Sequence, residues 1–363
     1  MAKPLPVKTI GTRNRADVAI GVLIASAVFV VGLLWAKWTP YVTKALGTGR
    51  THRWSGPNIL TVGSVRAGDS PSWHAAATFF HAYLASIWPA LVVALLISAS
   101  VQALLPRSWL PRALNRRHPI SSALAGGVAG MPSMMCTCCA APVAVTLRRN
   151  DVTSPAAVAY WLGNPLLNPA VLAFLWLVAP WQWTLTRMVV GVATVLGVAV
   201  AVGLVTGARG NRLATTATAD APGDERPAAR GRRFVQALLR LCVFLLPEYA
   251  ILVLLIGAVR GWLLTLVQPG GNGLLHGLLI AVLAAIVGTL IVIPTAGEIP
   301  VLQGLALLGA SSGTLGALLI TLPAVSIPGA AMVVRGFGWR VVATTTVVVM
   351  LAGVLGATVL SLL

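Results

Sequence analysis

Three cysteines gather in the thirteen-residue segment GMPSMMCTCCAAP, which covers residues 130–142. Cys136, Cys138 and Cys139 are three of only four cysteines in the chain, and the fourth is Cys242. Thiolate sulfur selects soft ions such as Cu(I) and Zn(II) over Mg²⁺ and Ca²⁺. The spacing lets neighbouring sulfurs face one ion, so the segment predicts a site for a soft metal or a metalloid such as As(III).

Methionine supplies further soft sulfur in the same segment, at Met131, Met134 and Met135. We include Met135, the residue before Cys136, among the predicted metal ligands, because a thioether suits the same ions. The alternative for each of these residues is apolar packing, since methionine and free cysteine both fill cores. Packing is what we expect of the isolated Cys242.

The composition places this segment in a membrane protein. The 363 residues are 57% hydrophobic and 9% charged, with a mean hydropathy of +0.88. Eight acidic residues cannot cover the surface of a soluble domain of this length. The net charge of +18 comes from Lys and Arg between apolar runs. That pattern is typical of loops that face anionic lipid, so we expect lipid and not nucleic acid as a partner.

Long apolar runs predict the elements that must position the cysteines. Runs of about 20 residues are long enough to cross a bilayer as helices. The chain has seven of them, near 18–36, 75–105, 155–178, 186–208, 235–267, 314–334 and 340–362. Two further apolar stretches, 120–147 and 275–309, contain Pro-rich breaks and predict broken hairpins. The fold class we predict is therefore an all-α polytopic membrane protein.

The polar segment 209–233 predicts a mobile cytoplasmic linker between two transmembrane halves. We divide the chain into a first helix and outer loop at 1–74, a first repeat at 75–208, this linker, and a second repeat at 234–363. With a cytoplasmic N-terminus, the inner loops hold 18 Lys and Arg and the outer loops hold 6. The excess inside favours that orientation and puts the C-terminus outside.

The same orientation places the cysteines at membrane depth. The stretch 120–147 must enter and leave on the cytoplasmic side, and a helix over 120–130 rises about 16 Å, half of the bilayer. The segment 136–147 makes the return, with Pro142 expected in its first turn. The helix dipole at that N-terminus favours the thiolate form of the cysteines. Irregular backbone at this depth must be buried in protein or line a cavity.

An internal match indicates that the second broken stretch repeats the first. With an offset of 158 residues, Pro142 aligns with Pro300 and Pro165 with Pro323, and CTCCAAP lies over PTAGEIP. Counting crossings, the first half begins outside and the second inside. The pattern predicts an inverted-repeat transporter with two re-entrant hairpins that meet at the membrane midplane, where such proteins bind their substrates.

The residues CTCCAAPVAVTLRRNDVTSPAAVAYWLGNPLLNP resemble the YraQ-like permease family, the UPF0718-type predicted permeases. One branch of this family exports trivalent organoarsenicals. The resemblance implies a permease of the bacterial plasma membrane and transport by export. Cys139 stands where the family usually has glycine, so this chain carries one more thiol and its ligand can differ from the family's.

Two acids at membrane depth are candidates for proton coupling. Glu298 is the only acid at the second break, and Glu248 lies beside Pro247 within an apolar run. We expect Glu298 to exchange the proton released when thiols bind a soft cation, because buried ionisable residues in membranes are usually functional. The alternatives are an N-cap role for Glu298 and an ion pair of Glu248 with Arg240 or Arg260.

Three polar residues beside prolines complete the predicted substrate site. Asn164 and Asn168 in GNPLLNP lie on one helix face, and Ser326 takes the place of Asn168 in the second half. We expect all three in the wall of the cavity.

The sequence leaves three functions open, of which a secondary-active permease without enzymatic activity or a resident cofactor is the first. The second is a membrane thiol oxidoreductase that uses Cys136, Cys138 and Cys139. The third is a scaffold that holds a metal ion without moving it. Nothing in the sequence indicates the substrate's identity or the oligomeric state.

Overall fold

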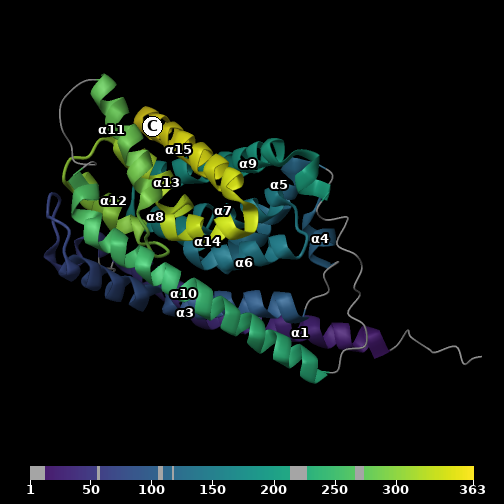
Figure 1. The fold of residues 1–363 in the computed structure, drawn as a ribbon. Helices are drawn as coiled ribbons and strands as arrows, with labels where there is room; N and C mark the ends of the chain where they lie inside the picture. Colours follow the sequence, from purple (N-terminus) through teal and green to yellow (C-terminus); the bar gives the residue numbers. More distant parts are fainter. Residues whose placement is uncertain (1–12, 55–57, 105–108, 117, 213–226, 266–273) are drawn as a thin grey trace, which may run out of the picture.

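Helices make up every regular element in the part of the chain that the structure, a computed structural model, describes (Figure 1). The described residues are 13–54, 58–104, 109–116, 118–212, 227–265 and 274–363. Six helices within them are long and apolar enough to cross a membrane, and a pair bent by 48° makes a seventh candidate. They correspond to the seven predicted spans, which confirms an all-α polytopic membrane protein.

The N-terminal region and the first half contain the elements up to residue 212. Their bounds are α1 Arg13–Leu33, η1 Leu34–Trp38, α2 Thr39–Thr51, η2 Ile59–Ser64, α3 Trp73–Leu104, α4 Trp109–Leu114, α5 Pro119–Gly130, η3 Met131–Ser133, α6 Thr137–Arg149, α7 Ser154–Leu166, α8 Pro169–Val178 and α9 Trp181–Arg212. The second half follows residue 226. It consists of α10 Pro227–Thr265, α11 Leu274–Leu290, α12 Glu298–Leu307, α13 Ser312–Ala324, α14 Ile327–Phe337 and α15 Trp339–Leu362.

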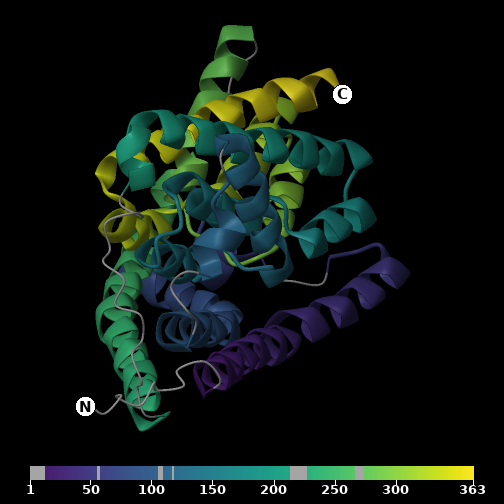
Figure 2. The ribbon, with the colours of Figure 1, turned by 90° about the vertical axis from the view of Figure 1, so that its right-hand side faces the viewer.

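The first helix is longer than the predicted span at 18–36. It continues through the π-helical turn η1 into α2 and ends at Thr51, so much of the expected outer loop is helical. The predicted span ends just before Lys37, but in the structure Lys37 is buried and hydrogen-bonded within the helix that continues past it. Pro40 does not end the helix, which continues through it directly after the π-helical turn. Figure 2 shows this helix, in purple, along the edge of the helical body.

The predicted linker, 209–233, lies partly outside the described residues, which omit 213–226. At both of its ends the chain is helical, because α9 continues to Arg212 and α10 begins at Pro227.

Both predicted hairpins are broken helices. The first consists of α5 and α6 with an irregular tip at 134–136 after η3, and the second consists of α11 and α12 with an irregular tip at 291–297. The predicted span 155–178 is also interrupted, because α7 ends at Leu166 and α8 begins at Pro169. The bent pair α13 and α14 has the same interruption in the second half.

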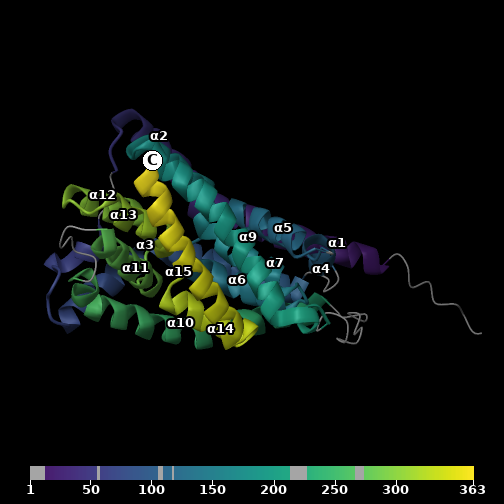
Figure 3. The same ribbon diagram turned by 90° about the horizontal axis from the view of Figure 1, so that it is seen from above.

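The two halves share their element boundaries at the offset found in the sequence. Helices α7 and α13 begin at Ser154 and Ser312, and α9 and α15 begin at Trp181 and Trp339, 158 residues apart in both cases. Packing repeats as well, since α5 and α9 contact α7 while α11 and α15 contact α13. The long helices α3 and α10 lie side by side, and α9 packs along α15 (Figures 1 and 3).

Candidate functional site

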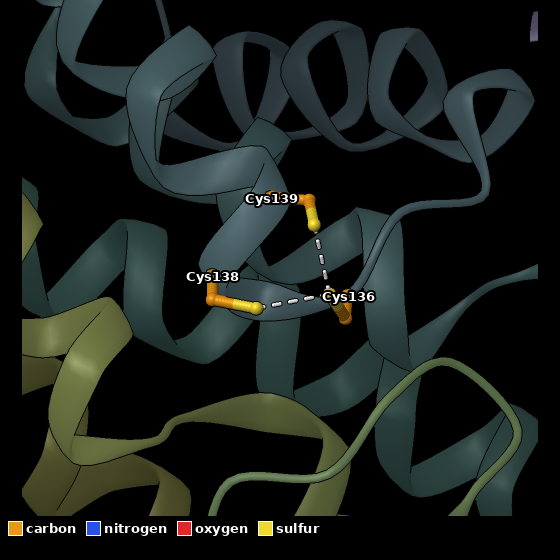
Figure 4. Close-up of side chains that lie close together, drawn as sticks. All are labelled: Cys136, Cys138 and Cys139. Atoms are coloured by element: carbon orange, nitrogen blue, oxygen red, sulfur yellow. Dashed lines mark hydrogen bonds between the residues drawn. The ribbon is translucent and has the colours of Figure 1, made fainter. Parts of the chain in front are cut away.

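The three predicted cysteines form one sulfur cluster at the tip of the first hairpin (Figure 4). The Sγ atom of Cys136 lies 3.0 Å from that of Cys138 and 3.2 Å from that of Cys139. All three sulfurs lie within 4.8 Å of one another, and all three side chains are buried. A single soft ion bound between them would need only small side-chain adjustments, since a Zn–S bond, for example, is about 2.3 Å long.

The local helix explains why the three sulfurs converge. Helix α6 begins at Thr137, so Cys136 is its N-cap and the other two cysteines lie in its first turn. The first backbone N–H groups of a helix have no intrahelical acceptor, and they carry the positive end of the helix dipole. The predicted place of Pro142 in the first turn is wrong, because the helix starts at the tip and Pro142 lies one turn further along. There it leaves the Cys138 carbonyl without its helical N–H donor.

Two tyrosines that the sequence analysis missed hold the sulfur of Cys138. The hydroxyl of Tyr83 on α3 lies 3.1 Å from this sulfur, and the hydroxyl of Tyr249 on α10 donates to it at 3.3 Å. Both tyrosines are buried and their rings are 6.1 Å apart. The available signal was weak: a buried tyrosine hydroxyl needs a partner, but nothing in the sequence relates α3 and α10 to the hairpin.

Asn164, which we expected in the wall of a cavity, is buried and holds the first tip through hydrogen bonds. Its Oδ1 atom accepts hydrogen bonds from the Ser133 hydroxyl and, at 3.3 Å, from the backbone N–H of Met135. Close packing brings α5 to this point, since a Cβ atom on Gly130 would lie 2.6 Å from the Tyr160 carbonyl oxygen. Met135, the residue before Cys136, has a buried side chain. Its role as a thioether ligand stays a prediction.

Asn168 and Ser326 are matching helix caps. Asn168 accepts from the backbone N–H groups of Ala170 and Val171 at the start of α8, and Ser326 accepts from Gly329 N–H at the start of α14. Such caps satisfy N–H groups that a broken helix would leave free. The Nδ2 group of Asn168 is buried and has no protein acceptor, so both of its N–H donors stay available.

The tips of the two hairpins meet at a small void. This void has a volume of about 10 Å³, roughly the space of one water molecule. It is lined by Cys136 from the first tip, by Ile293, Pro294, Thr295 and Glu298 from the second, and by Pro165 and Pro323 from the two interrupted spans. Cys136 therefore shares a void with the second tip and with a proline from each of the two interrupted spans.

Arg187, which we counted among the outer-loop charges, is instead buried on α9 and ties the second tip to the break between α7 and α8. Its guanidinium lies 2.8 Å from the Glu298 carboxylate, and both side chains are buried. It also donates to the carbonyl oxygen of Pro165 at 2.7 Å. That carbonyl lacks a helical donor because Pro169, four residues on, has no N–H. Glu298, for which we predict proton exchange, is thus ion-paired, and its role in proton exchange stays a prediction.

The first tip makes a comparable contact with the second half. The Thr137 hydroxyl donates to the Pro323 carbonyl oxygen at 2.5 Å, where α13 approaches its end. The Trp161 indole N–H donates to the Thr137 carbonyl oxygen at 2.8 Å and fixes the start of α6. The matched residues Pro165 and Pro323 thus each offer a carbonyl to a polar side chain beside the void.

Glu248 does not line the void between the two tips. Its carboxylate is 3.2 Å from the guanidinium of Arg335, with more than half of the arginine side chain exposed. The predicted pairing with Arg240 or Arg260 is not what the structure contains. Arg260 instead donates to the carbonyl oxygens of Ala75 and Val62.

Comparison with known proteins relates nearly the whole chain to permeases. A family model described as a predicted permease matches residues 72–362. UPF0718 protein YraQ of Escherichia coli (strain K12) is 37% identical over 333 residues, which cover 90% of this chain and 91% of that protein. No solved structure matches the chain significantly. The residues matched by the family model include both hairpins and the cysteine cluster, but not η1 or α2.

Proposed function

The chain belongs to this predicted-permease family, and from that premise we propose that it is a secondary-active permease with a cysteine-lined site. Its substrate is a soft metal or metalloid species, such as As(III), an organoarsenical or Cu(I), or a small thiol-reactive sulfur compound. The observation that carries this proposal is the position of the three sulfurs, which lie where two broken hairpins meet.

The cluster supplies the chemistry that such a substrate needs. Cys136, Cys138 and Cys139 offer up to three thiolates, and each thiol that binds a soft ion releases its proton. The hydroxyls of Tyr83 and Tyr249 hold one sulfur in place before the substrate arrives. The void beside Cys136 is too small for more than a water molecule, so the tips separate to admit substrate.

Glu298 couples this separation to protons in our proposal. A proton on the carboxylate removes the charge that Arg187 faces, which weakens the bond between the second tip and the α7–α8 break. Glu248 is the second candidate for proton transfer, at its pair with Arg335. If Glu298 carries the proton, a pH gradient should no longer drive transport by the Glu298→Gln variant. Full, still proton-driven transport by this variant would exclude Glu298 from coupling.

We further propose an inverted arrangement of the halves in a bacterial plasma membrane. Both hairpins re-enter the bilayer and their tips meet near its midplane, with the N-terminus cytoplasmic and the C-terminus outside. Broken helices that face each other at this depth are the sites at which many secondary transporters bind substrate. The direction is export, by analogy with the arsenical-exporting branch of the family.

Ligand binding by purified protein tests the site. Cu(I), Zn(II), As(III) and methylarsenite are titrated under reducing conditions, followed by calorimetry and by sulfur-ligand absorption. We expect one species to bind with one-to-one stoichiometry, and Cys136→Ser/Cys138→Ser to lose that binding. Cys242→Ser is the matched control, because Cys242 lies on α10 outside the cluster. Equal binding by the cluster variant would refute a cysteine-lined site.

A thiol oxidoreductase is the second candidate. Cys136 and Cys139 form a Cys-x-x-Cys pair at a helix N-terminus with sulfurs 3.2 Å apart, an arrangement that favours thiol redox chemistry. Reduction of a quinone by the dithiol form, with matching disulfide formation in the protein, would favour this function. Flux across sealed vesicles, which a metal-holding scaffold would not support, distinguishes the permease from the third alternative.

A further inference from the structure

A second and larger cavity lies against the second tip, and its charge is positive. Its volume is about 260 Å³, and Lys37, Tyr41, Lys44, Trp54, Pro294 and Thr295 are among its lining residues. No acidic side chain belongs to the lining in the part of the chain that the structure describes. Two ammonium groups therefore line one cavity without a balancing carboxylate.

Lys37 is the more deeply placed of the two lysines. It is only 5% exposed, and its Nζ atom donates to two neutral hydroxyls, those of Tyr41 and Thr295, both at 3.1 Å. Within the described residues it has no ion pair. Buried charges are costly unless they are paired, so this site is set up to receive a negative charge.

Lys44 and Trp54 add further donors to the lining. The Lys44 Nζ atom lies 3.5 Å from the centre of the Trp54 ring, a cation–π contact that holds both side chains. The indole N–H of Trp54 is buried and has no protein acceptor. A buried donor without a partner is unfavourable, and an oxyanion in the cavity would satisfy it.

The cationic cavity adjoins the sulfur cluster through two residues. Pro294 and Thr295 line both this cavity and the void that contains Cys136. Lys37 donates to the Thr295 hydroxyl at 3.1 Å, and Thr295 lines the void beside Cys136. The π-helical turn η1 also reaches the first tip, because the Trp38 indole N–H donates to the Pro132 carbonyl at 2.8 Å. Turns of this kind occur frequently at functional sites.

We propose that this cavity binds the anionic group of the substrate, which is a small anion with a soft, thiol-reactive atom. The anionic group lies against Lys37, Lys44 and the Trp54 N–H, and the soft atom faces Cys136 once Thr295 moves aside. A bare metal cation would be repelled by the two ammonium groups. The inference rests on the proposed permease and narrows its substrate to anions.

Binding measurements with a matched pair of anions test this inference. Thiosulfate carries a soft sulfur and an oxyanion group, whereas sulfate has the same charge without the soft atom. We expect the purified protein to bind thiosulfate at least about tenfold more tightly than sulfate, since only thiosulfate reaches both sites. Lys37→Met/Lys44→Met should weaken thiosulfate binding by about tenfold or more, because charge-assisted hydrogen bonds are lost.

Two variants control for charge and for folding. Arg50→Gln removes a positive charge from an exposed position on the same helix, α2, outside the cavity, and should leave binding unchanged. Lys44→Arg keeps the charge and should retain most of the affinity. Thermal unfolding of each variant in detergent shows whether the protein remains folded.

The phosphate of an anionic lipid could occupy the same cavity, so the titration is repeated in nanodiscs with and without phosphatidylglycerol. Lysine-dependent thiosulfate binding in both membranes supports the inference. Lysine-dependent retention of phosphatidylglycerol without thiosulfate binding overturns it in favour of a lipid site. Cysteine-dependent binding of methylarsenite that the lysine variants leave unchanged also overturns it, but leaves the proposed permease intact.

Discussion

At the scale of single residues, the three cysteines make different contacts where the two hairpin tips meet. Cys136 caps α6 and lines the void at the second tip, while Cys138 is held by two tyrosine hydroxyls from α3 and α10. Cys139 completes the triangle at 3.2 Å from Cys136. Each sulfur thus belongs to a different contact, and substitutions should separate their contributions.

The tyrosine contacts yield a prediction for ligand affinity. Tyr83→Phe/Tyr249→Phe should weaken binding of phenylarsine oxide, a trivalent arsenical probe, because Cys138 loses both hydroxyl partners. The loss should be about 2- to 10-fold for each hydrogen bond, at a net 0.5–1.5 kcal/mol per bond. Tyr160→Phe is the control, since the Tyr160 hydroxyl contacts Ser133 and not a cysteine. Affinity equal to that of the wild type would contradict a role for the tyrosines.

Residue types and spacing were enough to predict the cluster, because all three cysteines fall at the predicted turn of the hairpin, where the start of α6 brings their sulfurs together. They were not enough for Tyr83, Tyr249 or Lys37, which come from elements distant in sequence. Asn168 and Ser326 also cap helices, a role that depends on where the helices break, and their place in the cavity wall stays a prediction.

At the scale of elements, prolines explain the breaks around the site. Pro169 has no N–H group, so the carbonyl of Pro165 lacks a helical donor. Arg187 donates a hydrogen bond to that carbonyl and forms an ion pair with Glu298. The sequence predicted the breaks at 120–147 and 275–309, but it gave 155–178 and 314–334 as unbroken spans, which the structure interrupts. It misplaced the end of the first helix and the position of Pro142, because capping and burial, not hydropathy, decide where a helix ends.

The buried ion pair predicts a strong coupling between α9 and α12. Arg187→Met or Glu298→Gln alone should destabilise the protein by about 3–5 kcal/mol, because each leaves a buried partner unpaired. The double variant should lose less than the sum of both. Unfolding in detergent measures all three. Glu248→Gln/Arg335→Gln, at the partly exposed pair, is the control and should cost at most about 1 kcal/mol.

Additive losses in that double-mutant cycle would contradict a direct pair between Arg187 and Glu298. Such additivity would also remove the basis for a proton switch at Glu298, since the switch acts through Arg187.

At the scale of the whole molecule, two halves with matching boundaries surround one junction. Helices α7 and α13 occupy equivalent positions at an offset of 158 residues, as do α9 and α15, and α3 packs against α10. The sequence predicted this division from aligned prolines. It did not predict that the first helix, outside the family match at 72–362, reaches both tips through Trp38 and Lys37. Such contacts depend on tertiary packing, which hydropathy does not encode.

The proposed inverted arrangement predicts the sidedness of single introduced cysteines. Gly231→Cys, near the linker, should react with an impermeant maleimide only from the cytoplasmic side, and Leu363→Cys only from outside. Gly231 is exposed and has open space around its Cα, so the substitution should not disturb packing. Labelling is compared in intact cells and in inside-out vesicles, with Cys242→Ser as background. Reaction of both positions from the same side would contradict the arrangement.

The central claim is that the cysteine cluster lies on a transport path. It is tested most directly by flux into proteoliposomes of the soft species that binds most tightly, measured for the wild type, Cys242→Ser and Cys136→Ser/Cys138→Ser. Our account predicts uptake by the first two and background uptake by the cluster variant, with all three proteins equally folded. Uptake by the cluster variant at the wild-type rate would show that the substrate does not pass through these sulfurs.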